Sequence, residues 1–246
     1  MTEAVAVAAA ALVTALATGL GAVPFGFLRS PSRRLLGVAS AAAGGFMLAA
    51  ALILIWEGIG YGISPVVLGC LFGAAAMLFV RRRLRHERRA HLGALRGADA
   101  VKALAIIGIM TAHSFAEGVG LGVSYRGGDA LGVFVTIAIA IHNIPEGLAI
   151  ALILVPRGSS VRSASAWGVV SSLPQPLMAV PAFLFVETFA EVLPYGLGFA
   201  AGAMASMVLS ELIPDARREA RPAPIAVSFG AAFAAMMALQ LALLPT

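Results

Sequence analysis

The chain has 246 residues, of which 60% are hydrophobic and only 12% charged, and its mean hydropathy is +0.95. No soluble domain of this length needs so much apolar surface, so the composition indicates a membrane protein that crosses the bilayer several times. A single cysteine, Cys70, excludes an internal disulfide framework and argues against a Cys-based metal site. The pI near 10.3 could suggest a nucleic-acid-binding protein. The basic residues lie between apolar segments, however, which is typical of membrane topology.

The amino-terminal segment carries Glu3 and lacks the cationic stretch that opens a signal peptide. We therefore expect residues 5–28 to be kept as a first membrane span. No linker along the chain is long enough to hold an extramembrane domain. The sequence thus predicts a single polytopic membrane domain over residues 1–246.

Apolar segments recur along the whole chain and predict an all-α membrane protein with eight transmembrane helices. The expected spans cover residues 5–28, 36–56, 64–80, 101–124, 131–155, 165–186, 195–212 and 225–244. The third and seventh are short for a membrane crossing, so their ends are the least sharply defined.

The positions of the basic residues test this number of spans independently. With eight spans, 16 of the 17 Lys and Arg residues fall on one side of the membrane and Arg126 alone falls on the other. The positive-inside rule makes the first side cytoplasmic and places both termini outside the cytoplasm. The largest basic group then forms a cytoplasmic loop at about residues 81–100.

Two apolar segments each carry a histidine and a glutamate four residues apart, followed by glycine. The first reads His113-Ser-Phe-Ala-Glu117-Gly and the second His142-Asn-Ile-Pro-Glu146-Gly. Residues i and i+4 share a helix face, so each pair points its imidazole and carboxylate the same way. The connection at 125–130 is short, and the two helices should be antiparallel neighbours. Nitrogen and carboxylate ligands suit zinc, with iron, manganese or cobalt as rivals, so we expect a metal site between helices four and five.

The depth of these pairs in the membrane makes the pattern specific. A helix of about 24 residues rises roughly 36 Å, so both pairs fall near the middle of the bilayer. An ionisable residue there costs about 2.5–3.5 kcal/mol on insertion scales and is rarely kept without a role. The alternative is that His and Glu only hydrogen-bond between helices and hold the bundle together.

Prolines interrupt two of the expected spans close to the proposed site. Pro145 has no amide hydrogen, so the carbonyl of Ile141 loses its helical partner beside His142. The sixth span contains Pro174, Pro176 and Pro181 and should be kinked or partly unwound around Gln175. Freed carbonyls at membrane depth are tolerated where they line a cavity or find other partners, while a packing kink is the alternative.

These motifs, with eight spans and a cytoplasmic loop after the third, resemble the ZIP (Zrt/Irt-like) family of metal-ion transporters, compact bacterial type. Weaker signatures are Ala-Leu-Ala-Thr-Gly-Leu-Gly at 15–21, Gly-Phe-Met-Leu-Ala-Ala at 45–50 and Ala-Gly-Ala-Met at 201–204. The resemblance implies that residues 1–246 form one transport domain that moves a divalent metal, commonly zinc, toward the cytoplasm.

The resemblance also implies roles for individual residues. His113, Glu117, His142 and Glu146 would form the main metal site, and Met47 would be a soft contributor from the second span. Ser114, Asn143 and Gln175 fall where the family places further ligands for a second, adjacent metal, and Glu211 resembles a carboxylate on the inward release route.

Two departures from the family pattern matter. Members with two adjacent metals usually supply a carboxylate where this chain has Gln175, and Ser114 is also neutral. We therefore expect one tightly bound metal. The basic loop has only His86 and His91 in place of the histidine-rich run of many relatives, so metal sensing by this loop is not expected.

The resemblance leaves two other kinds of protein to weigh. An intramembrane metal-dependent hydrolase would need an open coordination position and a general base, but the chain lacks His-Glu-x-x-His and each glutamate is wanted as a ligand. A proton-coupled permease for an organic solute would need an aromatic or arginine cluster at depth, and none is present. We thus expect a transporter and not an enzyme.

The expected partners follow from this interpretation. Zn²⁺ is expected as substrate and not as cofactor, with Fe²⁺, Mn²⁺, Cd²⁺ and Co²⁺ as alternatives. Membrane lipid surrounds the chain, a homodimer is left open, and nucleic acid is not a partner. The expected location is the cell membrane as a multi-pass protein, in the bacterial inner membrane.

Overall fold

The computed structural model describes residues 2–27, 32–84, 91–92, 95–96, 98–126 and 128–243. These residues are almost entirely helical, with one short antiparallel hairpin of β1 (His91–Leu92) and β2 (Leu95–Arg96). The α-helices are α1 (Thr2–Leu20), α2 (Arg33–Ile59), α3 (Ile63–Leu84), α4 (Ala98–Arg126), α5 (Asp129–Leu154), α6 (Val161–Ser172), α7 (Pro174–Leu184), α8 (Val186–Met207), α9 (Ile213–Glu219) and α10 (Pro222–Leu243). Two 3-10 turns, η1 (Val23–Gly26) and η2 (Val155–Arg157), and a π-helix, η3 (Val208–Leu212), join some of them.

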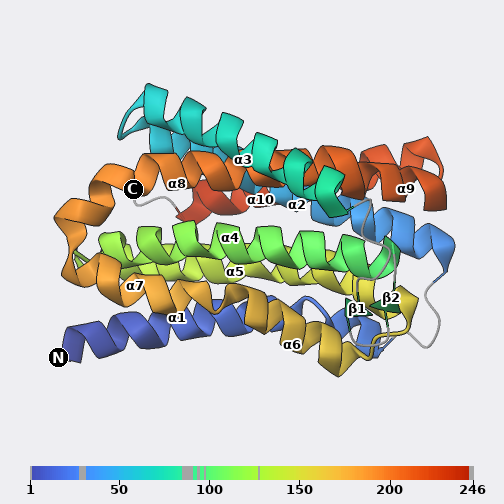
Figure 1. The fold of residues 1–246 in the computed structure, drawn as a ribbon, viewed down its shortest axis with the longest axis horizontal. Coiled ribbons are helices and arrows are strands. Elements are labelled where there is room, and N and C mark those ends of the chain that lie inside the picture. The colour runs from blue at the N-terminus through green and yellow to red at the C-terminus, as the bar shows by residue number, and fades with distance from the viewer. Residues whose placement is uncertain are drawn as a thin grey trace.

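The helices form two groups that lie side by side along the length of the molecule (Figure 1). The first group contains α2, α3, α8, α9 and α10, and the second contains α1, α4, α5, α6 and α7. In the first group α3 packs along α8 and α10 along α2, and in the second α4 packs along α7 and α5 along α1. The groups meet mainly where α4 faces α8 and where α2 faces α5. The two helices that carry the His/Glu pairs therefore lie at the interface between the groups.

Among the described residues, six helices are long and apolar enough to cross a membrane. They cover residues Glu3–Leu20, Arg33–Ile59, Asp99–Arg126, Asp129–Arg157, Val186–Glu219 and Pro222–Ala242. The third expected span appears as a shorter apolar helix at Ile63–Phe79. The sixth is divided between α6 and α7, each too short to cross alone. The all-α membrane class is thus confirmed, and the number eight stays a prediction.

Three expected spans have different ends in the structure. Helix α1 stops at Leu20, because Pro24 starts a 3-10 turn there, so the first span does not continue as one helix toward 28. The sixth breaks at Leu173, with Pro174 opening α7, which confirms the interruption expected around Gln175. The helix that contains the expected seventh span, α8, begins at Val186 rather than at residue 195. Glu187 lies in its first turn, where a carboxylate interacts favourably with the helix dipole.

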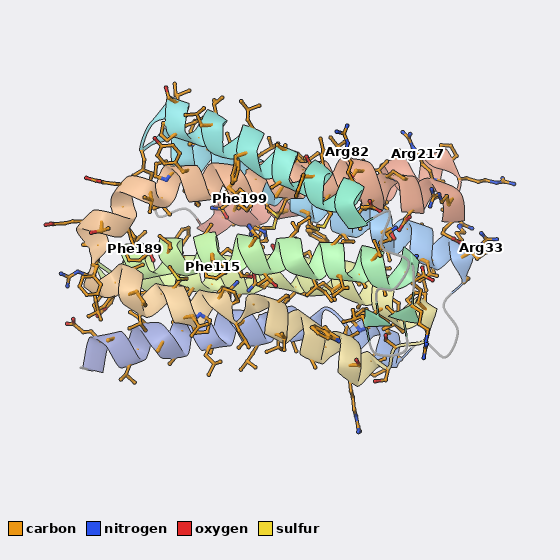
Figure 2. All side chains as sticks on the ribbon, in the orientation of Figure 1. Arg33, Arg82, Phe115, Phe189, Phe199 and Arg217 are labelled. Atoms are coloured by element: carbon orange, nitrogen blue, oxygen red, sulfur yellow. The ribbon has the colours of Figure 1, made fainter. Side chains whose placement is uncertain are left out.

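The basic loop predicted at 81–100 is only partly described. Helix α3 continues to Leu84 and α4 begins at Ala98, with the β1–β2 hairpin between them. Residues 85–90, 93–94 and 97 lie outside the described residues, as do residues 28–31 of the first basic loop. Three of the described arginines, Arg33, Arg82 and Arg217, lie toward the same end of the molecule (Figure 2).

Glycines allow the backbones of several helices to approach closely. A Cβ atom built on Gly147 of α5 would lie 1.7 Å from the carbonyl oxygen of Thr18 on α1. A Cβ on Gly202 of α8 would lie 2.1 Å from the carbonyl oxygen of Cys70 on α3. Neither contact leaves room for a side chain, so small residues set the helix separations in both groups.

Candidate metal centre

The two His/Glu pairs meet where α4 and α5 lie against each other. His113 and Glu117 come from α4, and His142 and Glu146 come from α5. One ligand atom from each of the four side chains lies within 4.8 Å of all the others, and all four residues are buried. The sequence spacing therefore predicted this cluster, because the i, i+4 pairs of two neighbouring helices face each other.

Short distances join the four side chains, and one oxygen of Glu146 contacts both imidazoles. Nε2 of His113 lies 2.9 Å from Oε1 of Glu146 and 3.4 Å from Oε1 of Glu117. Nε2 of His142 lies 3.3 Å from the same oxygen of Glu146. In a tetrahedron whose corners lie about 2.0 Å from a central zinc ion, the edges measure roughly 3.3 Å. The separations of these donor atoms thus fit the edges of one coordination shell.

Six buried atoms of these side chains make no hydrogen bond of suitable geometry in the part of the chain that the structure describes. They are both ring nitrogens of His113, Nε2 of His142, Oε1 of Glu117 and both carboxylate oxygens of Glu146. Buried polar atoms without partners are costly, and each needs an explanation. Convergent lone pairs on nitrogen and oxygen suit a borderline divalent cation better than they suit hydrogen bonds between helices.

A cavity of about 680 Å³ reaches two of these four residues. Glu117 and His142 line it together with Glu57, Tyr61 and Arg126. Tyr61 follows the carboxyl end of α2 and Arg126 ends α4, so the cavity runs from the site toward that end of the bundle. Most of its wall is apolar.

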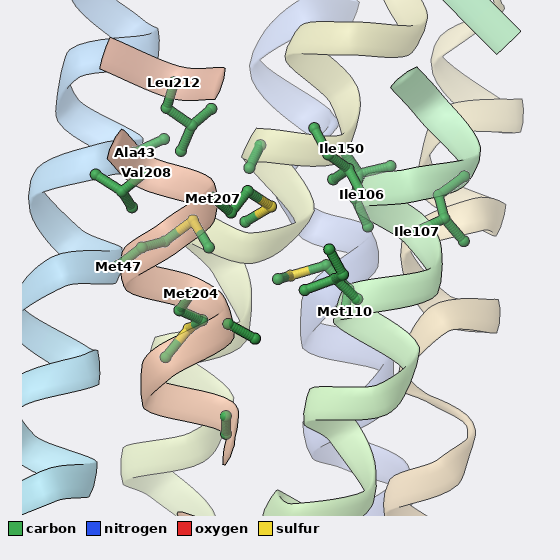
Figure 3. Packing of buried hydrophobic residues seen from close by; sticks show 14 of the residues in the cluster. Ala43, Met47, Ile106, Ile107, Met110, Ile150, Met204, Met207, Val208 and Leu212 are labelled. Atoms are coloured by element: carbon green, nitrogen blue, oxygen red, sulfur yellow. The ribbon is translucent and has the colours of Figure 1, made fainter. Parts of the chain in front are cut away.

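The other predicted site residues fall into two sets. Ser114, Asn143 and Gln175 are buried beside the cluster, and Nε2 of Gln175 donates a hydrogen bond to Oε2 of Glu117. Met47 lies in the apolar core, in the same cluster as Met204, Met207 and Val208 (Figure 3). Glu211 lies outside the four-residue cluster, in the π-helix η3, where its Oε2 is 3.2 Å from Nζ of Lys102.

Two contributors to the surroundings of the site do not stand out in the sequence. Thr14 of α1 bonds both Asn143 and Gln175, and Lys102 of α4 contacts Asp215 as well as Glu211. A lone threonine in an apolar span is usually packing, so nothing near residue 14 indicated this role. A lysine near a helix end likewise looked like one more basic residue on the cytoplasmic side.

The fold and the cluster together define a helical membrane protein with a buried His/Glu site suited to a divalent cation. The profile of the ZIP zinc transporter family matches residues 81–240, more than half of the chain. The chain therefore belongs to the ZIP zinc transporter family. This is a family of transporters and not of enzymes, in agreement with the expectation from the sequence.

Several relatives share long stretches of this sequence. A putative zinc transporter of Arabidopsis thaliana is 46% identical over 232 residues, which cover 93% of this chain and 37% of that protein. The zinc transporter GufA of Myxococcus xanthus is 32% identical over 85% of this chain and 87% of its own length. The zinc transporter ZIPB of Bordetella bronchiseptica is 36% identical over 64% of this chain and 51% of its own. The chain thus spans little more than a third of the plant relative and most of GufA.

Proposed function

We propose that this protein carries divalent metal ions, zinc first among them, across a membrane toward the cytoplasm. The observation that carries the proposal is the convergence of His113, Glu117, His142 and Glu146 on one place, where Nε2 of each histidine and Oε1 of each glutamate have no hydrogen-bond partner of suitable geometry among the described residues. A transported ion must be bound firmly enough to lose water and loosely enough to leave again. Two imidazoles and two carboxylates are suited to such intermediate affinity, whereas four thiolates would retain the ion.

The proposed site holds one cation tightly. His113, Glu117, His142 and Glu146 are the proposed ligands, with Met47 as a soft neighbour and Glu211 on the inward release route. Ser114, Asn143 and Gln175 carry no charge, so a second dication would meet the repulsion of the first without a further anion to offset it. Fe²⁺, Mn²⁺, Cd²⁺ and Co²⁺ can satisfy the same donors and are proposed as competing substrates.

The proposed topology has eight spans, with both termini outside the cytoplasm. Counting α3 as one span and the broken α6–α7 pair as another brings the six long apolar helices to eight. Figure 1 supports an even number, since α1 begins and α10 ends toward the same end of the bundle. Arg33, Arg82 and Arg217 lie at the opposite end, which the positive-inside rule makes cytoplasmic.

We place this single transport domain, residues 1–246, in the cell membrane and, by the relationship to GufA and ZIPB, in a bacterial inner membrane. Lipid surrounds it, and a homodimer remains one of the assemblies to test. A metal-dependent hydrolase within the membrane is not favoured, because both glutamates lie among the donor atoms, where ligands are wanted.

Metal uptake by purified protein in liposomes tests the proposal. Zinc, cadmium, iron and manganese are compared with and without a proton gradient. His142→Ala and Glu146→Ala should abolish zinc uptake while the protein still inserts, and Glu187→Gln, an exposed carboxylate away from the cluster, serves as the matched control. Zinc uptake at the wild-type rate by both alanine variants would show that the proposed site is wrong.

A further inference from the structure

A chain of hydrogen bonds leads from α1 through the polar residues beside the site to Glu117. Nδ2 of Asn143 donates to the backbone carbonyl oxygen of Thr14 at 2.7 Å and to Oε1 of Gln175 at 3.1 Å. Nε2 of Gln175 then donates to Oε2 of Glu117. All four residues are buried.

The direction of this chain is fixed independently at its two ends. The Thr14 carbonyl can only accept a hydrogen bond, so Asn143 must turn its amide nitrogen toward it. A carboxylate oxygen can also only accept, so Gln175 turns its own nitrogen toward Glu117. Reversing either amide would set oxygen against oxygen. The Thr14 hydroxyl lies 2.6 Å from Oε1 of Gln175 and 2.8 Å from the backbone carbonyl oxygen of Ala11. When it gives its one proton to Gln175, it acts with the same polarity.

The consequence for Glu117 is that its two oxygens become different. Oε2 is occupied by an N–H donor of Gln175. Oε1 lies 3.4 Å from Nε2 of His113 and is buried without a hydrogen-bond partner among the described residues. The oxygen that faces the imidazoles is thus the one left open, and the oxygen that could reach a second cation is already taken.

We propose that Gln175, oriented by Thr14 and Asn143, is a positioning residue that presents Glu117 to the metal through Oε1 alone. This role rests on the proposed metal site. The amide N–H of Gln175 is a neutral hydrogen-bond donor to Oε2 of Glu117, in the place where a second cation would bind that oxygen. Outer partners that fix a ligand's orientation in this way commonly change metal affinity strongly when they are removed.

The test uses cobalt(II) as the probe with the purified full-length protein, because the intensity of its visible absorption reports coordination number. Gln175→Leu removes the donor and frees Glu117 to bind through both oxygens. It should weaken cobalt binding about 10- to 100-fold and reduce the absorption per bound ion as coordination number rises. Thr14→Val keeps the backbone carbonyl but loses the hydroxyl. It should lower the cobalt affinity and the absorption per bound ion as well, but less than Gln175→Leu does.

Thr18→Val is the matched control. Thr18 lies one turn further along α1, is equally buried, and pairs with the hydroxyl of Ser172 at 2.7 Å rather than with the site. Its cobalt affinity and spectrum should match the wild type. If Gln175→Leu does not yield folded protein, the comparison of cobalt affinity and absorption between Thr14→Val and Thr18→Val decides the question.

Wild-type affinity and absorption in both Gln175→Leu and Thr14→Val would overturn the positioning role. His142→Ala separates that outcome from failure of the metal site itself. Loss of cobalt binding in His142→Ala supports the site whatever Gln175 does. A wild-type spectrum in His142→Ala would show that cobalt binds elsewhere, so that the proposed function and the role of Gln175 would both fall.

Discussion

Glu146 connects both imidazoles of the candidate site through one oxygen, whereas Glu117 contacts only one imidazole within the cluster. Glu146→Gln should therefore weaken zinc binding more than Glu117→Gln does. Glu117→Gln leaves Glu146 in contact with both histidines. Competition titration with a zinc-sensitive dye measures the two affinities. Equal losses, or a larger loss in Glu117→Gln, would contradict the central place of Glu146.

Gln175 gives a second prediction at the scale of single residues, concerning the number of metals. In Gln175→Glu, one carboxylate oxygen can still accept from Thr14 and Asn143, which turns the other toward Oε2 of Glu117. Two facing carboxylates repel each other unless a cation lies between them. We expect one zinc per chain in the wild type and a second, weaker zinc in Gln175→Glu. Titration calorimetry counts both, and a stoichiometry that stays at one in the variant would contradict the expectation.

The sequence predicted that the four side chains would meet, but it did not predict the surroundings that orient them. Residues i and i+4 of one helix report a shared face directly, and repeating the pattern in the next helix predicted the meeting of the pairs. The bonds of Thr14 reach residues 129 and 161 positions away, and no local pattern encodes such contacts. The resemblance to the family marked Gln175 as a site residue. Which end of its amide faces Glu117 depends on hydrogen bonds that start at the Thr14 carbonyl in another helix.

At the scale of helices, the crossing of α1 and α5 depends on Gly147, which follows Glu146 directly. Even a methyl group on Gly147 would overlap the Thr18 carbonyl, since a Cβ there lies 1.7 Å from that oxygen. Gly147→Ala should push α5 away from α1 and lower stability by about 1–3 kcal/mol, as overpacking does. It should also displace Glu146 and weaken zinc binding.

Gly230→Ala is the control for this change, because a Cβ on Gly230 of α10 meets nothing within 4 Å. Unfolding in detergent and zinc titration of both variants make the comparison. Replacing a helical glycine by alanine without a clash should be neutral or stabilising. Unchanged stability and zinc affinity in Gly147→Ala would mean that the two helices can separate there at no cost.

The prolines made the break in the sixth span predictable, but nothing in the sequence predicted where α8 begins. Pro174 cannot continue a helical hydrogen-bond ladder, so a break at that place followed from the sequence. The expected spans left residues 187–194 between the sixth and the seventh, but polar residues can extend a helix beyond the apolar segment that crosses the membrane. Hydropathy marks the membrane thickness, and it does not mark where hydrogen bonding of the backbone begins.

At the scale of the whole molecule, Lys102 joins the two helix groups. Of the ion pairs between described side chains, only those of Lys102 on α4 with Glu211 and Asp215 cross from one group to the other. These three side chains are largely buried. Breaking the pair would leave carboxylates in a poorly hydrated place, so Lys102 should hold the groups together at this end.

A double-mutant cycle with Lys102→Met and Asp215→Asn measures this connection. We expect a coupling of about 1.5–3 kcal/mol in the free energy of unfolding, as for a hydrogen bond to a charged group. The exposed pair of Arg33 and Glu219, whose members both belong to the first group, gives the control cycle and should show a much smaller coupling. A coupling for Lys102 no larger than the control would mean that apolar packing alone joins the groups.

The π-helix η3 between α8 and α9 suggests a place where one residue could be deleted from the chain. A π turn closes over one more residue than an α turn, so η3 contains a residue that a continuous α-helix would not need. The hydroxyl of Ser210 there is buried and has no hydrogen-bond partner among the described residues, so its loss breaks no such bond. A chain lacking Ser210 should convert η3 into an ordinary α turn, keep α8 and α9 in phase, fold, and bind zinc at the four-residue cluster, as unfolding and zinc titration would test. Deletions are normally tolerated in loops, whereas here we expect the chain to tolerate one inside a helix.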